Sequence, residues 1–222
     1  MIAIIQTYGS MLIQALGKTL LLTLLSLFFA MIIGMIFSLM NVGKNRLLNF
    51  IGTAYVDAVR GVPLIVLTYF IYFGVPTGIQ MMGASDFRMP ALVAGTIALS
   101  MNCGAYMAEI IRAGIESVDK GQMEASRSLG LNYGKSMRLV VLPQAIRTMI
   151  PSIINQFIIT LKDTSILSVI GLAELTNMGK TISGNTFKSL EAWAIIGVMY
   201  MIVIITLSKI AKRVERSANR GR

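Results

Sequence analysis

One long run without any charged side chain limits what this chain can become. Thr19–Met40 contains 22 residues, and none of them is ionisable. A helix needs about 20 mostly apolar residues to cross the hydrocarbon core of a bilayer. The apolar core of a secretory signal is shorter, about 7–15 residues, and it ends at a small-residue cleavage site. We therefore expect a retained membrane span.

The composition of the whole chain supports this interpretation. Of the 222 residues, 55% are hydrophobic and 14% are charged, whereas soluble domains carry about 25% charged residues. The chain has no histidine and one cysteine, Cys103. These counts exclude a Ser-His-Asp triad, a Cys-His pair, a histidine-based metal site and an internal disulfide. We expect no catalytic residues, no metal and no cofactor.

Four further stretches are apolar enough to span a membrane, which predicts an all-α integral membrane protein with five transmembrane helices. Residues 1–222 form a single transmembrane domain. The second span, extended back to Phe50 for sufficient length, contains Asp57 and Arg60, and it is expected to kink at Gly61 and Pro63. The predicted spans are residues 19–40, 50–75, 90–111, 150–171 and 190–208.

The distribution of lysine and arginine predicts the orientation of these spans. Six basic residues follow Ser208 and six more lie within Arg112–Arg147, but Met1–Gly17 has none and only Lys18 follows it before the first span. Cytoplasmic loops carry the excess of basic residues. We therefore expect the N-terminus outside, the C-terminus in the cytoplasm, and Met1–Gly17 at the outer surface. Basic residues confined to such loops do not indicate nucleic-acid binding.

The cytoplasmic loop of residues 113–149 has a pattern of its own. Asp119–Leu129 fits a short helix, and Gly130 follows where a left-handed residue would end it. A second helix is expected from Tyr133 to Leu142, where Pro143 interrupts it. The loop is too small for a separate core but longer than a simple connection. It is either a solvated basic loop or a folded docking surface, and the ordered caps favour the second.

These residues resemble a known family. Glu124-Ala125-Ser126, Gly130 and Leu142-Pro143 are similar to the "EAA" loop of ABC importer permeases, although Ser126 stands where that pattern usually has alanine. Four stretches resemble the polar amino-acid branch of the family, and the resemblance covers residues 15–210. They are RGVPLIVLTYFIYFG (60–74), AYMAEIIRAGI (105–115), GQMEASRSLG (121–130) and LKDTSILSVIGLAEL (161–175).

The resemblance implies a type I importer permease core in a bacterial cytoplasmic membrane. A second permease copy or a paralogue would pair with it, with a dimer of ATP-binding cassette subunits below and an extracytoplasmic solute-binding protein above. The helix that carries Gly121, Glu124, Ala125, Ser126 and Gly130 would couple the permease to the ATPase. ATP would be bound by the partner.

The chain itself lacks a phosphate-binding loop. Such a loop requires a glycine five residues before Gly-Lys-Ser/Thr. Three Gly-Lys-Ser/Thr tripeptides occur, but the required glycine positions hold Leu12, Leu129 and Glu174.

Polar residues within the apolar runs are candidates for the substrate path, because charges in a bilayer persist only when they are paired or face a polar cavity. A cavity with both charge signs, hydroxyl groups and amides suits a zwitterionic amino acid. The candidates are Asn102, Asp163, Thr164, Ser165, Asp57, Arg60 and Lys162.

Structural ion pairs are the competing explanation for these residues. Asp57 and Arg60 can pair at a spacing of three, as can Glu109 and Arg112, and we favour structural pairing for Arg60 and Lys162. For Asp163, Thr164, Ser165 and Asn102 both interpretations stand, and the resemblance favours the path.

Three other functions remain open at this stage: an ABC permease for another small solute such as methionine or a quaternary amine, a channel, and a membrane-embedded enzyme. Asp57 and Asp163 argue mildly against the first. The lack of a filter-like segment and of histidine argues against the other two. The sequence does not identify which amino acid is carried.

Overall fold

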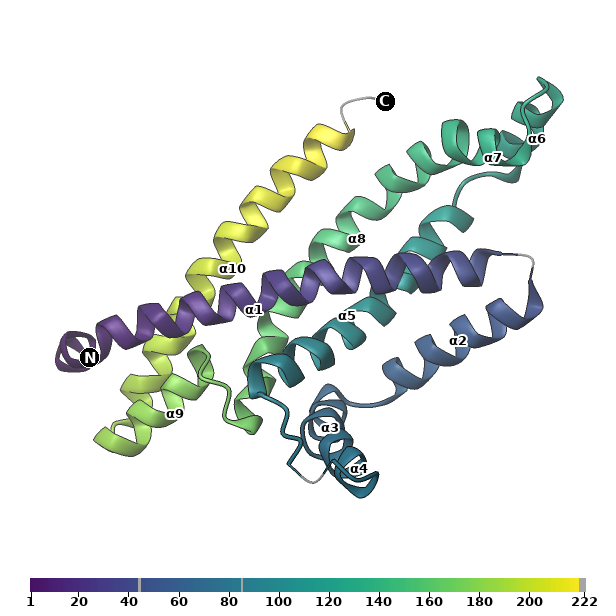
Figure 1. The fold of residues 1–222 in the computed structure, drawn as a ribbon. Helices are drawn as coiled ribbons and strands as arrows, with labels where there is room; N and C mark the ends of the chain where they lie inside the picture. Colours follow the sequence, from purple (N-terminus) through teal and green to yellow (C-terminus); the bar gives the residue numbers. More distant parts are fainter. Residues whose placement is uncertain (44, 85, 220–222) are drawn as a thin grey trace.

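The computed structural model describes residues 1–43, 45–84 and 86–219, which form helices joined by short connections (Figure 1). Arg220 and Arg222, two of the six basic residues that follow Ser208, lie outside the described residues, as does Lys44. The α-helices are α1 (Ile2–Val42), α2 (Arg46–Gly61), α3 (Leu64–Tyr69), α4 (Val75–Met81), α5 (Ala91–Glu116), α6 (Lys120–Ser128), α7 (Tyr133–Ser136), α8 (Leu142–Asp163), α9 (Leu175–Thr186) and α10 (Ser189–Asn219). Two π-helical turns, η1 (Phe70–Gly74) and η2 (Met137–Val141), and a 3₁₀ helix, η3 (Thr164–Ile170), interrupt them.

Five helical segments of the described chain are long and apolar enough to cross a membrane: Ile2–Val42, Leu64–Met81, Ala91–Glu116, Tyr133–Ile170 and Ser189–Arg213. The predicted number of spans is confirmed, and several helices extend beyond the predicted spans. The first helix begins at Ile2, so residues 2–17 continue directly into the first predicted span. Its buried Ile4 and Leu12 pack with Ile195 of α10. At 1.5 Å per residue, α1 is about 60 Å long, about twice the thickness of a hydrocarbon core.

The second predicted span is two elements. Helix α2 ends at Gly61, and Val62 is extended (φ −104°, ψ 130°) because the residue before a proline disfavours helical geometry. A new apolar segment begins at Leu64 and forms the span. The predicted kink is therefore a complete break, and Asp57 and Arg60 lie on α2, outside the spanning segment.

Proline does not end the fourth spanning segment. Pro143 was expected to interrupt the helix, yet the helix continues from Tyr133 to Ile170. The π-helical turn η2 precedes Pro143, and the Leu142 N–H bonds to the carbonyl of Met137, five residues back. This wider turn takes the backbone out of α register where the proline lacks an N–H, so the chain can continue. The turn η1 precedes Pro76 in the same way.

Helices α1 and α5 form the centre of the molecule and approach closely. A Cβ atom at Gly34 would lie 2.5 Å from the Cβ of Met107, and one at Gly104 would lie 2.7 Å from Ile33 Cγ2. Neither distance is possible for real side chains, so these glycines permit the close contact. Small residues serve this purpose between helices in lipid.

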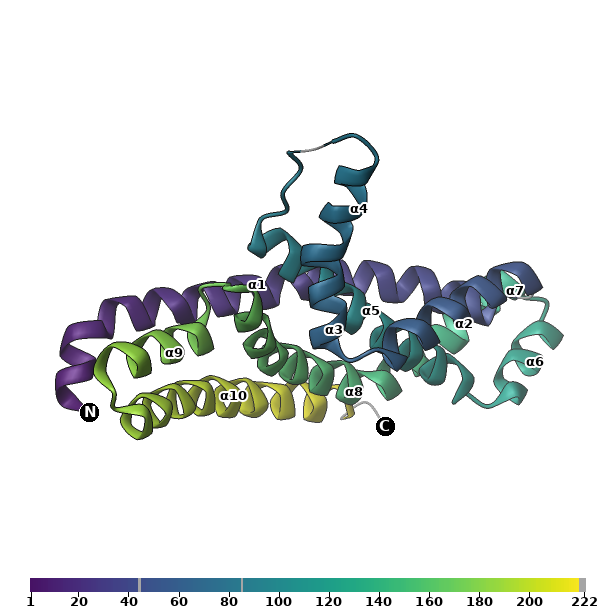
Figure 2. The same ribbon diagram turned by 90° about the horizontal axis from the view of Figure 1, so that it is seen from below.

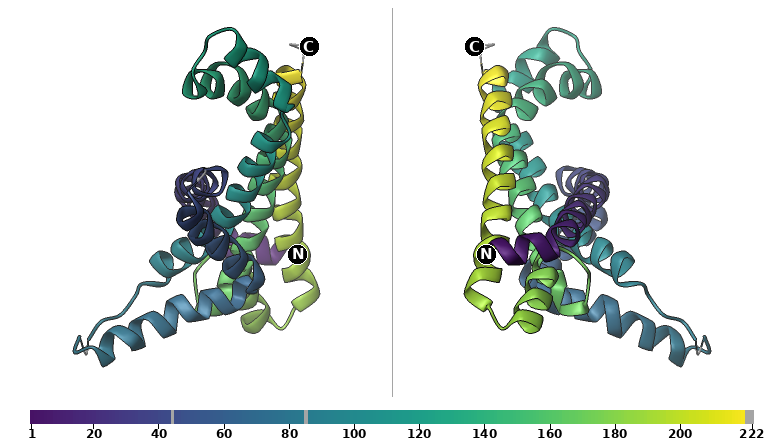
Figure 3. Two further views of the ribbon diagram at one scale, coloured as in Figure 1. Left: turned by 90° about the vertical axis from the view of Figure 1, so that its right-hand side faces the viewer. Right: turned by 90° about the vertical axis from the view of Figure 1, so that its left-hand side faces the viewer.

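The molecule has two different ends. Figure 3 shows α6 together with the C-terminal end of α10 at one end, and α9 at the other. Figure 2 shows α4 projecting away from the other helices. The helix of the predicted docking loop therefore lies far from α9 and α4.

Candidate functional site

A pocket of about 480 Å³ lies where the break between α2 and α3 faces α5 and α8. Its walls contain a cation, a carboxylate, two amides and a phenol, which can bind a ligand carrying both charge signs. The residues that line it are Arg60, Gly61, Val62, Pro63, Leu64, Asn102, Tyr106, Gln156, Ile159 and Asp163.

Helical spacing places the polar groups of this pocket. Asn102 and Tyr106 are four residues apart on α5, and Gln156 and Asp163 are seven apart on α8, so each pair lies on one helix face. Asn102 is 7% exposed and Gln156 is 6% exposed. Arg60 comes from the last turn of α2, and the extended Val62 and Pro63 separate it from the start of α3.

The structure brings three of the seven path candidates together, since Arg60, Asn102 and Asp163 all line this pocket. The other four lie outside its lining. Lys162 and Asp57 are exposed, Ser165 is half-buried in η3, and the buried Thr164 donates a hydrogen bond to the carbonyl of Leu161. Among the described residues, no group of three histidine, cysteine, aspartate or glutamate side chains could hold a metal ion.

Two pocket residues, Tyr106 and Gln156, were not predicted. Both lie within predicted spans, yet neither was among the candidates, which included the equally uncharged Asn102. Their spacing of four from Asn102 and seven from Asp163 is the signal that could have identified them.

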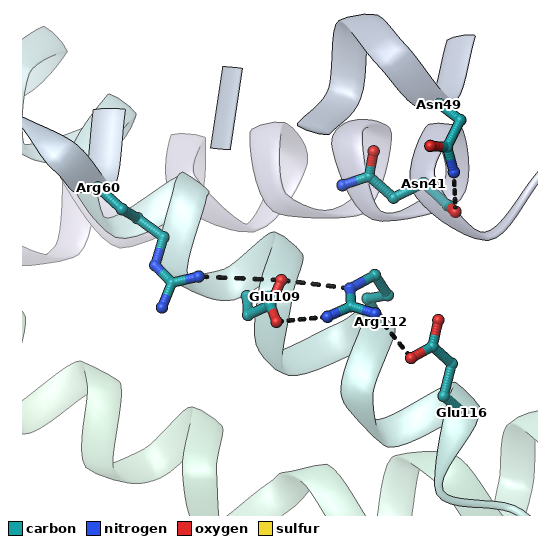
Figure 4. A network of polar contacts seen from close by, with 6 residues as sticks. All are labelled: Asn41, Asn49, Arg60, Glu109, Arg112 and Glu116. Atoms are coloured by element: carbon teal, nitrogen blue, oxygen red, sulfur yellow. Dashed lines mark hydrogen bonds and ion pairs between the residues drawn. The ribbon is translucent and has the colours of Figure 1, made fainter. Parts of the chain in front are cut away.

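The predicted Asp57–Arg60 pair was wrong. Arg60 instead reaches across to α5, where its Nη1 lies 3.9 Å from an Oε2 atom of Glu109 and its guanidinium lies 5.1 Å from the ring centre of Tyr106. Arg60 lies in the last turn of α2, just before the extended Val62, and its side chain contacts α5 at both Tyr106 and Glu109. Figure 4 shows Arg60 and Glu109 facing each other across the two helices.

Glu109 is part of a longer network along α5. Arg112 donates to both of its carboxylate oxygens, at 2.6 Å and 3.2 Å, and also to Glu116 at 2.7 Å. The predicted local pair of Glu109 and Arg112 is confirmed. The network runs from the pocket to the last residue of α5 (Figure 4).

The predicted helix of the docking loop is confirmed as α6, and both of its ends have specific caps. The Asp119 carboxylate accepts the N–H of Gly121 at 2.7 Å at the start. At the end, Gly130 has φ +88°, the left-handed geometry that glycine adopts without strain. The N–H of Leu131 then bonds to the carbonyl of Ser126 at 3.2 Å and closes the helix.

One side of α6 contacts the rest of the molecule and the other is free. Met123 packs against the apolar cluster that contains Ile111 of α5 and Ala145 of α8, and Ser126 is buried. The exposed side carries Gly121, Glu124, Ala125 and Leu129, and Leu129 is 85% exposed.

A second polar centre lies away from the pocket. Glu174 is 0% exposed, and its carboxylate accepts the N–H groups of Thr176 at 2.8 Å and Asn177 at 2.6 Å. The hydroxyl of Tyr200 donates to it at 3.0 Å, which ties α9 to α10. Burial raises the pKa of the Glu174 carboxyl, an effect that these hydrogen bonds reduce.

The fold and the site define a class of protein: a multi-pass, all-helical membrane protein with a polar pocket between its helices and an anchored, exposed helix at one end. The chain belongs to the family described as the binding-protein-dependent transport system inner membrane component, which matches residues 26–220. It is a permease subunit of an ABC importer and a multi-pass inner-membrane protein. Membership of this family implies ATP-binding and permease partners.

Named relatives are similar over nearly their full length. The glutamine transport system permease protein GlnP of Escherichia coli (strain K12) is 37% identical over 206 residues, which cover 93% of this chain and 92% of the relative. The arginine transport system permease protein ArtQ of Bacillus subtilis (strain 168) is 36% identical over 204 residues, 92% of this chain and 90% of the relative.

Solved structures agree with this assignment. The crystal structure of an amino acid ABC transporter with histidines has a TM-score of 0.88 and 38% identity, covering 96% of both chains. The MetNI methionine ABC transporter in an inward-facing conformation has a TM-score of 0.78 but only 20% identity over 96% of this chain and 98% of that chain. The second likeness therefore concerns the fold alone.

Proposed function

We propose that this chain forms the translocation path of an ATP-driven importer for polar amino acids. The single observation that carries the proposal is the pocket of about 480 Å³ in which Arg60 and Asp163 supply opposite charges beside two amides. A free amino acid carries a carboxylate and an ammonium group, and it requires such a combination. Relatives named as glutamine and arginine permeases support the same substrate class.

The polar groups of the pocket have complementary roles toward a zwitterion. The Asp163 carboxylate would accept hydrogen bonds from the ammonium group, and the Arg60 guanidinium would donate to the carboxylate. Asn102, Gln156 and Tyr106 offer both donors and acceptors for the polar side chain of the solute. Lys162, Thr164, Ser165 and Asp57, which do not line the pocket, would act elsewhere along the path or support its shape.

Energy would enter at the opposite side of the chain from the solute. The exposed side of α6 would dock on a dimer of ATP-binding cassette subunits, which bind the ATP. Their closure would move α6, and Met123 would transmit this movement to α5 and α8. A second permease copy or a paralogue would complete the path. An extracytoplasmic solute-binding protein would deliver the amino acid at the α9 end, with the N-terminus outside and the C-terminus in the cytoplasm.

Replacing Asp163 with asparagine tests the role of the pocket. The change removes the charge and keeps the shape, so binding of labelled L-glutamine or L-arginine should weaken by about tenfold, as expected for a lost charged hydrogen bond. Asp57→Asn is the matched control, because Asp57 is exposed on α2 and outside the pocket lining.

Assembly must be measured beside binding. Co-purification of the ATP-binding subunits should be the same for D163N and for the wild type. Equal loss of binding and assembly in D163N would mean that Asp163 is structural, and equal binding losses in D163N and D57N would remove the pocket from the path.

A further inference from the structure

Arg60 belongs to two sites at once, and the way it is held has consequences. It lines the polar pocket, and it is also the first residue of the charged network along α5. Its side chain is 37% exposed and that of Glu109 is 32% exposed. Neither group is therefore fixed by tight burial, and the position of Arg60 depends on its contacts with neighbouring side chains.

The two arginines do not share Glu109 equally. Arg112 donates to both Glu109 oxygens, and its Nη2 contact is 2.6 Å long. Arg60 makes no hydrogen bond to Glu109, since its contact is 3.9 Å long, within ion-pair range only. The hydrogen-bond donors of the Arg60 guanidinium are thus not used by Glu109, although the carboxylate attracts it.

The ring of Tyr106 provides the second support for Arg60. The guanidinium carbon lies 5.1 Å from the ring centre, within the range of a cation–π contact. Tyr106 also lines the pocket. Attraction to Glu109 and contact with Tyr106 together hold the guanidinium at the edge of the pocket.

We infer that Glu109 is a positioning residue for solute recognition: it holds Arg60 at the pocket so that the free donors of Arg60 face the α-carboxylate of the amino acid. This inference rests on the proposed function, in which Arg60 binds that carboxylate.

Charge balance explains why a carboxylate is needed at position 109. Arg60 and Arg112 face Glu109 from two sides, while Glu116 balances Arg112 from the far side. If Glu109 became neutral, Arg112 would repel Arg60, because both guanidinium groups lie beside the Oε2 atom of Glu109 and like charges remain coupled at partly exposed sites. Arg60 would then move away from the pocket edge into solvent.

Glu116 provides a matched control. It pairs with Arg112 at 2.7 Å and belongs to the same network, but within the described residues it forms no ion pair with Arg60. Glu116→Gln removes the same charge as Glu109→Gln and leaves the partner of Arg60 in place. A general effect of network charge would appear in both variants, and a positioning effect only in E109Q.

The test uses the purified permease with its ATP-binding subunits, without the external binding protein. Equilibrium binding is measured for L-glutamine and L-arginine and for their α-carboxamides, which lack the carboxylate charge. The wild type should bind each amino acid (the acid) more tightly than its α-carboxamide (the amide). In E109Q, affinity for the acids should fall about fivefold, the range of a partly exposed ion pair, with affinity for the amides unchanged. E116Q should keep the wild-type preference.

Further variants keep the inference falsifiable if E109Q assembles poorly. Glu109→Asp retains the charge and should preserve most of the preference for acids. In an Arg60→Gln background, E109Q should have no additional effect on acid binding, because the residue that it positions is gone.

The results separate the inference from the proposed function. Equal weakening of acid and amide by E109Q, an unchanged preference in E109Q, or the same loss in E116Q would overturn the positioning role while leaving the wild-type pocket intact. A wild-type complex that binds neither amino acid, or binds acid and amide equally, would overturn the proposed recognition and the inference with it.

Discussion

Single residues show where charge can be buried in this molecule. Glu174 is enclosed where α9 meets α10, and its carboxylate accepts two backbone N–H groups and the Tyr200 hydroxyl. It also begins α9 as its N-terminal cap. Because Leu175 N–H bonds to Thr19 of α1 at 3.0 Å, this centre connects three helices. Its protonation state should therefore affect the stability of the whole α9 end.

The raised pKa of Glu174 predicts the sign of a pH effect. Its carboxyl group holds a proton more tightly in the folded chain than in the unfolded chain, whose value is near the ordinary 4.5. Glu174 therefore contributes its full stabilisation when the pH is below the pKa of the unfolded chain. This stabilisation is lost as the pH rises through the higher pKa of the folded chain. Glu174→Gln should remove this pH-dependent contribution. As the pH rises, the melting temperature of E174Q should therefore increase relative to that of the wild type.

Thermal unfolding of the detergent-solubilised complex between about pH 4 and about pH 8 measures this effect. Asp86→Asn, a change at an exposed loop residue, controls for removing a carboxylate. If the difference between wild type and E174Q stays constant with pH, burial of Glu174 does not have the predicted consequence.

At the scale of single residues, the sequence identified polar groups of the pocket better than it identified the residues that they contact. Asp163 and Asn102 were found because polar groups in apolar runs need a polar cavity. Tyr106 and Gln156 also lie in predicted spans but were not selected, and only their helical spacing from Asn102 and Asp163 would have placed them in the same pocket. The Asp57–Arg60 pair was wrong because helical spacing considers one helix only, and Arg60 finds Glu109 on another helix.

Among the elements, α6 was predicted nearly to the residue. Its signals are local: Asp119 caps the start, and Gly130 supplies the left-handed turn that ends it. The π-helical turns before Pro76 and Pro143 were not predictable in this way. A proline in the sequence indicates the end of a helix. Tertiary packing and the lipid environment, in which unpaired backbone N–H and C=O groups are costly, favour continuing the helix instead.

The cap of α6 leads to a prediction about coupling. Gly130→Val forces a β-branched residue into left-handed geometry at a cost of about 1–2 kcal/mol, which should loosen the end of α6 without disturbing the spans. Uptake should fall severalfold while ATP hydrolysis continues and the subunits still co-purify. Gly134→Val is the control, because Gly134 lies in α7 without positive φ. Wild-type uptake in G130V would show that α6 has no coupling role.

At the scale of the whole molecule, five spans were predictable because hydropathy is a property of long segments. Their boundaries were less so. The sequence could not show that α1 is one helix from Ile2 to Val42, since its first part is stabilised by packing on α10. The orientation stays a prediction from the positive charges, and the separation of α6 from α9 fits it (Figure 3).

We expect this chain to move amino acids only when an ATPase acts on its α6 end. The most direct measurement is uptake of labelled L-glutamine and L-arginine by proteoliposomes that contain the permease, its ATP-binding subunits and the solute-binding protein. We predict accumulation only when ATP is present on the side that α6 faces and the binding protein is on the side that α9 faces. Equal uptake without ATP, or by the permease alone, would contradict the account.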